Sequence, residues 1–111
     1  IMVMLRRFGQ TIKLKPECRE EYVRQHKAVW PGVLRMIKEC GLRNYSIFLK
    51  DNLLFAYFEY EGKDYETDMQ KMAQHKETQR WWKLVKPLMQ PLKSKKPGEF
   101  WSEMEEIFHV N

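Results

Sequence analysis

The sequence predicts an α+β fold of the ferredoxin-like type, with the element order strand, helix, strand, strand, helix, strand (βαββαβ) and a four-stranded antiparallel sheet covered by helices on one face. Three observations support this prediction. Polar and apolar residues alternate early in the chain, two long segments carry apolar residues at helical spacing, and a turn pair separates two stretches rich in aromatic and branched side chains. With 111 residues, 43% of them hydrophobic, we expect a single domain over 1–111.

The first expected strand runs from Val3 to Leu14, where polar and apolar residues alternate with a period near two. The apolar positions are Met4, Phe8, Ile12 and Leu14, and the opposite face carries Arg7, Thr11 and Lys13. One face of this strand is therefore expected to pack on the core.

The first expected helix begins at Pro16 and ends near Cys40. Glutamates in its first turn suit the positive end of the helix dipole, and Gly41 suits a C-terminal cap. Pro31 interrupts this helix, because proline lacks a backbone donor and disfavours helical geometry at the residue before it. We therefore expect two helical pieces, joined by the segment from His26 to Pro31, and a joint of this kind can point side chains into a cleft.

The second and third strands are expected at Asn44 to Lys50 and at Leu53 to Glu61, joined by the turn pair Asp51-Asn52. One face of the second strand carries Tyr45, Ile47 and Leu49. Tyr57 lies near the middle of the third strand, so we expect tyrosine hydroxyls from both strands to project into a shared cavity.

The second helix is expected from Asp64 to about Lys86, with Trp81 and Trp82 in its last third. Its apolar face is marked by Met69, Met72 and Ala73. Three prolines predict an irregular connection over Pro87 to Gly98, and a last short strand is expected at about Met104 to Val110.

This arrangement leaves one face of the sheet without helices. Because that face carries aromatic and leucine side chains, we expect it to be buried against a second copy of the chain, which gives a homodimer with the sheets packed face to face.

The charge distribution argues against a nucleic-acid partner. The net charge of +5 equals the charge of five lysines that share one acid-free segment. These are Lys83, Lys86, Lys93, Lys95 and Lys96. Bases alternate with acids elsewhere, which is typical of solvated helix faces.

No apolar run approaches the roughly 20 residues of a membrane span, and no signal peptide is recognised. Cys18 and Cys40 are too few for a disulfide framework, so we expect reduced thiols and a cytoplasmic protein without membrane association.

Tyr22, His26 and Trp30 are spaced four residues apart and therefore share one side of a helix. Such an aromatic stripe is often simply core packing. His26 adds a second interpretation, because an imidazole both gives and takes protons near neutral pH and this one lies beside the expected helix break.

Neighbouring Trp81 and Trp82 point about 100 degrees apart on a helix, so we expect one to pack inward and one to face a groove. Flat aromatic faces suit the C–H faces of sugars, and also cores and interfaces. His75 and His109 are expected at the surface. The sequence contains no metal-ligand spacing, phosphate loop or dinucleotide fingerprint, so we expect no metal and no cofactor.

Several stretches together resemble the L-rhamnose mutarotase family. The resemblance rests on YVRQHKAVWP at 22–31, NYSIFL at 44–49, LLFA at 53–56, QRWWK at 79–83 and EEIF at 105–108. It implies a dimeric α+β barrel of ferredoxin-like subunits, an enzyme without metal or cofactor, and a free 6-deoxy sugar as substrate. It also implies site residues, with the proton donor at His26 and sugar contacts at Tyr22, Tyr45, Trp81 and Trp82.

The mechanism expected from this resemblance is general acid–base catalysis of ring opening and closure. Protonated His26 would give its proton to the ring oxygen while Tyr22 or Tyr45 holds or relays the anomeric hydroxyl. Three alternatives stay open at this point: a cofactor-independent monooxygenase on the same barrel, a non-catalytic sugar- or ligand-binding module, and an RNA-binding sheet.

Overall fold

A computed structural model describes residues 5–111, so Val3 and Met4 of the first expected strand lie outside the described residues. The strands are β1 (Arg6–Leu14), β2 (Leu42–Lys50), β3 (Leu53–Tyr60), β4 (Met89–Gln90) and β5 (Ser102–Met104). The helices are α1 (Arg19–His26), α2 (Pro31–Glu39), α3 (Tyr65–Gln74) and α4 (Lys76–Val85), with 3-10 turns at Pro16–Cys18 (η1) and Lys86–Leu88 (η2).

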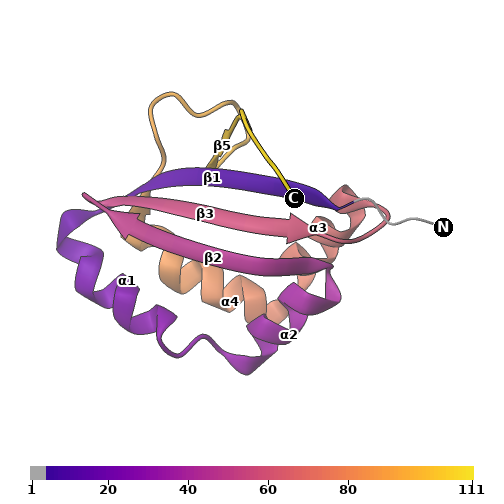
Figure 1. Cartoon of the computed structure of the whole chain (residues 1–111). Helices are drawn as coiled ribbons and strands as arrows, with labels where there is room; N and C mark the ends of the chain where they lie inside the picture. The colour runs from indigo at the N-terminus through magenta and orange to yellow at the C-terminus, as the bar shows by residue number, and fades with distance from the viewer. Residues whose placement is uncertain (1–4) are drawn as a thin grey trace.

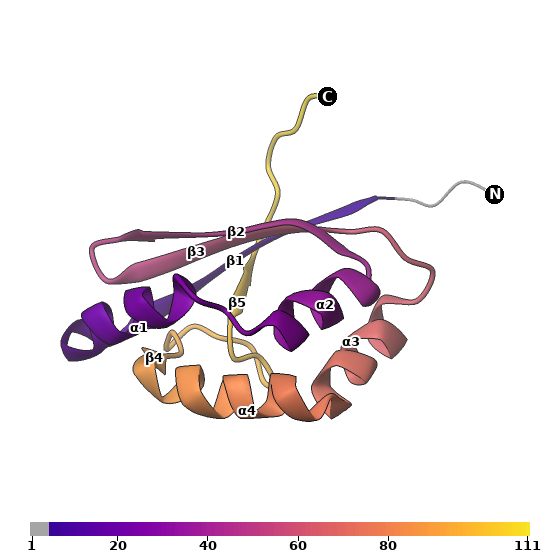
Figure 2. The same cartoon turned by 90° about the horizontal axis from the view of Figure 1, so that it is seen from below.

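The sheet is antiparallel and has the strand order β2-β3-β1-β4. This is the order of a ferredoxin-like fold, so the predicted fold class is confirmed. The three long strands lie above the helices in Figure 1. All four helices lie on one face of the sheet, and the C-terminal segment extends from the other face (Figure 2).

The expected helix break is confirmed at Pro31. Trp30 adopts an extended conformation (φ −61°, ψ 137°), and Pro31 is the first residue of α2. Gly41 ends this helical region with a φ of 86°, a value that glycine adopts without strain. Asp51 and Asn52 both have positive φ, which fits the predicted tight turn between β2 and β3.

The expected helix from Asp64 to Lys86 is in fact two helices. His75 adopts an extended conformation (φ −71°, ψ 122°) between α3 and α4, and its Nδ1 accepts a hydrogen bond from the Thr78 N–H at 3.2 Å. His75 is therefore the N-cap of α4 and is half-buried rather than solvated. The break sets α3 at an angle to α4 below the sheet (Figure 2).

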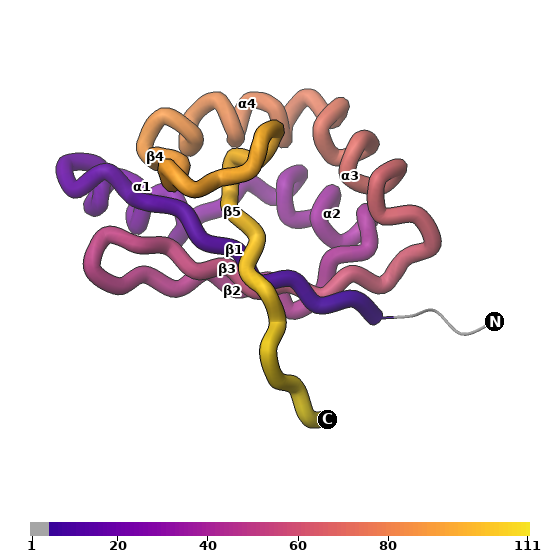
Figure 3. The backbone as a smooth tube through the Cα atoms, turned by 90° about the horizontal axis from the view of Figure 1, so that it is seen from above, coloured from indigo at the N-terminus to yellow at the C-terminus, as the bar shows by residue number. Residues whose placement is uncertain are grey.

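The last strand is also shifted from its expected position. The structure places β5 at Ser102–Met104, whereas Ile107 and Phe108 are 89% and 80% exposed. The connection expected to be irregular contains η2 and β4. Both short strands pair with the same edge of β1, with β4 at Lys13–Leu14 and β5 at Gly9–Thr11. Figure 3 shows β5 running beside β1 after the loop that follows β4. The sheet therefore has five strands instead of four.

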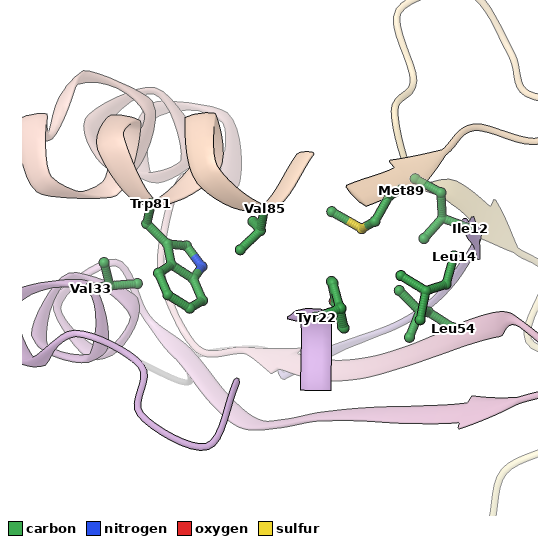
Figure 4. Packing of buried hydrophobic residues seen from close by; sticks show 8 residues of the cluster. All are labelled: Ile12, Leu14, Tyr22, Val33, Leu54, Trp81, Val85 and Met89. Atoms are coloured by element: carbon green, nitrogen blue, oxygen red, sulfur yellow. The ribbon is translucent and has the colours of Figure 1, made fainter. Parts of the chain in front are cut away.

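Alternate residues of β3 face the helices and are buried, namely Leu54, Ala56, Phe58 and Tyr60. Figure 4 shows part of the resulting core, with Trp81 reaching down from α4 beside Val33 of α2. Tyr57 lies on the opposite, helix-free face, where its hydroxyl donates to Glu59 at 2.7 Å. The expectation that Tyr57 shares a cavity with Tyr45 is therefore wrong, because the strand period of two separates it from that face.

Candidate active site

A cavity of about 260 Å³ lies between the sheet and the helices. It adjoins a groove of about 760 Å³ between α2 and β2. His26, Tyr45 and Trp81 are among the residues that line both spaces, so they lie where the groove meets the cavity. All five predicted site residues line the inner cavity: Tyr22, His26, Tyr45, Trp81 and Trp82. The structure thus brings together side chains from α1, β2 and α4.

His26 is the last residue of α1, where the chain leaves the helix for the joint before Pro31. Its Nδ1 lies 2.8 Å from the main-chain oxygen of Tyr22, one turn earlier. Because a carbonyl only accepts, Nδ1 carries the proton and Nε2 of the neutral ring is left as an acceptor. The rings of Tyr22 and His26 stack at a centroid distance of 4.0 Å.

Burial lowers the pKa of His26 below its ordinary value of 6.5, and the hydrogen bond to the Tyr22 carbonyl opposes this shift only in part. A half-buried imidazole with a lowered pKa is neutral at physiological pH. Nε2 can then take a proton from a bound hydroxyl group.

Tyr22 belongs to the core as well as to the cavity. It is 3% exposed and packs in the cluster that contains Ile12 and Leu54. Burial raises the pKa of its hydroxyl, and the neighbouring Tyr45 adds to this effect. Tyr22 therefore keeps its proton and can donate a hydrogen bond while its ring orients His26.

Tyr45 reaches the cavity because of a bulge in β2. The pairing with β3 shifts by one residue between Arg43 and Ser46, and Asn44 within this bulge has a φ of 51°. The shift turns Tyr45 toward the helices, where its ring lies 5.3 Å from that of Phe58. Tyr45 is 39% exposed at the cavity mouth, but burial of its hydroxyl raises the pKa to about 12.

The indole of Trp81 is 6% exposed and closes one wall of the cavity. It packs edge-on against His26 and against Trp30, at 5.3 Å from each ring. Trp82 is half-buried and carries the Lys86 ammonium 4.8 Å above its ring. Trp81 therefore points inward and Trp82 is more open, as expected for neighbours on a helix, although both line the cavity.

Sequence reasoning missed other residues of the cavity wall. Gln10 faces the cavity from β1, and Phe100 and Trp101 reach it from the connection that precedes β5. The position of Gln10 was predictable from the sequence, because alternation along the strand places this polar residue on the same face as the apolar Ile12 and Leu14. Phe100 and Trp101 carried no such signal.

Among residues 5–111, no group of three or more His, Cys, Asp or Glu side chains is placed to hold a metal ion. Within the same range no helix is both long and apolar enough to cross a membrane. Among the described cavity residues, the imidazole of His26 can transfer protons near neutral pH. Phenols, indoles, an amide, the Thr78 hydroxyl and the Lys86 ammonium can form hydrogen bonds.

Comparison with known proteins shows a consistent likeness. A family model described as L-rhamnose mutarotase matches residues 7–110. An L-rhamnose mutarotase from Oceanobacillus iheyensis is 34% identical over 109 residues, which cover 96% of this chain and 100% of that protein.

Two solved structures share the fold. The first is an L-rhamnose mutarotase from Formosa agariphila, with a TM-score of 0.74, 24% identity, and coverage of 96% of this chain and 99% of the other. The second is tetracenomycin F2 cyclase from Streptomyces glaucescens, a polyketide cyclase, with a TM-score of 0.67, 15% identity, and coverage of 96% and 97%. The scaffold thus occurs with more than one chemistry.

Proposed function

The chain belongs to the L-rhamnose mutarotase family, and from this premise we propose that His26 exchanges the protons when the enzyme interconverts the α and β anomers of free L-rhamnose in its cavity. The activity is that of a carbohydrate isomerase in rhamnose metabolism. The sugar's own hydroxyls and ring oxygen are the reacting groups, so the protein must supply proton transfer and positioning.

The observation that carries this proposal is the set of polar groups that face the cavity without a hydrogen-bonding partner. Among the described residues, no side-chain or main-chain group hydrogen-bonds to Nε2 of His26, to the hydroxyls of Tyr22 and Tyr45, or to the side-chain amide of Gln10. A polyhydroxylated ring would satisfy such groups from several directions. The cavity of about 260 Å³ lies below the range of roughly 300–1,000 Å³ typical of drug-sized ligands, which suits one small ring.

The tautomer of His26 favours a base as its resting role. Since Nδ1 donates to the Tyr22 carbonyl and burial lowers the pKa, the neutral ring presents a free lone pair at Nε2. This reverses the order expected from the sequence, in which protonated His26 acts first on the ring oxygen. The imidazolium formed in the first step then acts as the acid.

The proposed reaction begins when Nε2 of His26 takes the proton of the anomeric hydroxyl as the bond between the anomeric carbon and the ring oxygen breaks. The ring oxygen receives a proton from the hydroxyl of Tyr45, directly or through a water molecule. The resulting aldehyde turns about its bond to the second carbon. Closure on the opposite face returns the proton to Tyr45, and the imidazolium of His26 protonates the new anomeric oxygen.

The aromatic walls suit the remaining surface of the sugar. Trp81 and Trp82 offer flat faces to its C–H groups and to the methyl group of a 6-deoxy sugar. Tyr22 fixes the imidazole by stacking, and its hydroxyl is available to the substrate. These contacts complete the roles that we assign to the five site residues.

We extend the proposal to a cytoplasmic homodimer. The helix-free face of the sheet carries Phe48, which is 65% exposed, together with Phe55 and Tyr57. The C-terminal segment extends from the same face and is anchored there by two hydrogen bonds from Arg7 to Glu106 (Figure 2). A second copy packed on this face would bury these apolar groups. The free thiols of Cys18 and Cys40 suit a reducing compartment.

The test is anomer exchange of free L-rhamnose, measured by saturation-transfer NMR with and without the protein. We expect His26→Asn to lower the catalysed rate at least about 100-fold with the fold intact. His109→Asn, at an exposed histidine of the C-terminal segment, is the matched control and should exchange normally. Full activity in His26→Asn would remove the assignment, and sugar binding without faster exchange in the wild type would indicate a binding module.

A further inference from the structure

The start of α2 lacks the side-chain cap that a helix usually carries. Its N-cap residue is Trp30, whose side chain offers no acceptor to the helix, and Pro31 at the first position has no N–H. The first N–H of this helix belongs to Gly32, and it donates to Oε2 of Glu77 at 3.2 Å. The cap of α2 is therefore supplied by α4, across 45 residues of sequence.

The packing at this contact is tight. Gly32 is buried, and a Cβ atom at this position would overlap Oε1 of Glu77. Only glycine leaves room for the carboxylate in this position. Glu77 also lies in the first turn of α4, so its negative charge is close to the positive ends of two helices.

The same face of α4 makes a second contact one turn later. Trp81 packs against Trp30 and against His26, with ring centroids 5.3 Å apart in each pair. Helix α4 therefore holds the joint between α1 and α2 at two points, one polar at Gly32 and one aromatic at Trp30. His26 lies at the start of this joint, where Tyr22 of its own helix holds the imidazole through the main-chain carbonyl and the stacked ring.

We propose that Glu77 is a positioning residue, which locks the joint between α1 and α2 onto α4 and so sets the placement of the His26 imidazole against the Trp81 indole. This inference rests on the proposed role of His26 in anomer exchange. Glu77 does not line the cavity, and its effect on the reaction passes through Gly32 and Trp81. Without the carboxylate, the joint moves away from α4 and water reaches the imidazole.

The experiment compares Glu77→Ala, Glu77→Gln and Glu66→Ala by rhamnose anomer exchange over a range of sugar concentrations and pH. Glu66 occupies the same second position in α3 but is exposed, and within the described chain its side chain makes no hydrogen bond or ion pair to another helix, so Glu66→Ala is the matched control. We expect Glu77→Ala to lose about tenfold in kcat with a smaller change in KM, because misplacement of a catalytic group acts on the chemical step. Glu77→Gln keeps an acceptor oxygen and should retain most of the rate.

The pH midpoint of the activity provides a second measurement, which a general loss of stability would leave unchanged. Because burial lowers the pKa of His26, water entry in Glu77→Ala should raise the pH midpoint of the activity toward 6.5, with no such shift in Glu66→Ala. The ring signals of His26 and Trp81 should shift in the NMR spectrum of Glu77→Ala and stay in place in that of Glu66→Ala.

A second variant tests the contact from its other side. In Gly32→Ala the new methyl group displaces the carboxylate, so we expect the defect of Glu77→Ala. The double variant should be no worse than Glu77→Ala, because both changes break one contact. Equal rates and pH profiles in Glu77→Ala and Glu66→Ala would overturn the inference while leaving His26 in place. Full activity in His26→Asn would instead overturn the proposed function.

Discussion

The Nδ1 atom of His26 lies 2.8 Å from the main-chain oxygen of Tyr22, and the two rings stack 4.0 Å apart. One residue thus supplies both the acceptor that selects the tautomer and the surface that fixes the plane of the imidazole. Both contacts follow from the four-residue spacing on α1, which places the two side chains on one side of the helix. The free Nε2 is consequently held in one orientation toward the cavity before any sugar binds.

The first prediction concerns the pH dependence of anomer exchange. A base must be neutral, so the rate should fall as the pH drops through the pKa of His26, with a midpoint below the ordinary value of 6.5. Saturation-transfer rates between pH 5 and 8 measure this midpoint. A midpoint above 6.5 would contradict an imidazole buried as the structure has it.

The same pKa shift predicts a change in stability with pH. The folded chain binds fewer protons at His26 than the unfolded chain does, so the unfolding free energy should rise with pH through this window. The contribution is fully present above pH 6.5 and is lost as the pH falls toward the folded-state pKa. Thermal melts should therefore show that the melting temperature falls more steeply with decreasing pH in the wild type than in His26→Gln below pH 6.5. Above pH 6.5 the two proteins should respond to pH in the same way.

Substitution of Tyr22 should separate its ring from its hydroxyl. Tyr22→Phe keeps the stack on His26 and leaves no buried partner without a hydrogen bond, so we expect near-normal stability and a weaker affinity for rhamnose. Tyr22→Ala removes a side chain that is only 3% exposed and should cost about 3–5 kcal/mol in unfolding free energy. Denaturant unfolding and the KM of each variant test these two outcomes. Equal KM values in Tyr22→Phe and the wild type would limit Tyr22 to packing.

The local features of this fold were predictable because each depends on a few adjacent residues. Pro31 breaks the helix, Gly41 ends it with a positive φ, and Asp51-Asn52 turns the chain between two strands. The Tyr22 and His26 pair was also predictable, since it depends only on the period of one helix.

The features that were missed depend on contacts between distant parts of the chain. The β5 strand forms at Ser102–Met104 because the free edge of β1 lies at Gly9–Thr11, which no pattern near the C-terminus indicates. The contact of Glu77 with Gly32 likewise needs two helices to be placed in space first. Site residues on one helix were therefore easier to predict than those supplied by loops and strand edges.

A further prediction concerns Tyr45 as the partner of His26 in proton transfer. Since its pKa is raised to about 12, the phenol stays protonated through the neutral range and should cause no loss of rate below about pH 11. Tyr45→Phe should lower the rate by about 10-fold to 100-fold, because water can replace a relay only in part. The matched control is Tyr57→Phe on the opposite face of the sheet. An unchanged rate in Tyr45→Phe would leave this hydroxyl without a role in the reaction.

The last prediction tests the second copy of the chain. Phe48 is 65% exposed on the helix-free face of the sheet, and burying such a ring between two copies would contribute about 1.5–3 kcal/mol. Phe48→Glu places a charge there, and an unpaired charge is costly to bury, so we expect the dimer dissociation constant to rise by about 100-fold or more with the monomer still folded. Analytical ultracentrifugation over a range of concentrations measures this shift.

Leu34→Glu is the matched control, because Leu34 is 47% exposed on α2, on the other side of the sheet, and its replacement should leave the dimer intact. A wild-type chain that stays monomeric at all concentrations would contradict the dimer, whereas a Phe48→Glu variant that remains as dimeric as the wild type would place the interface on another surface.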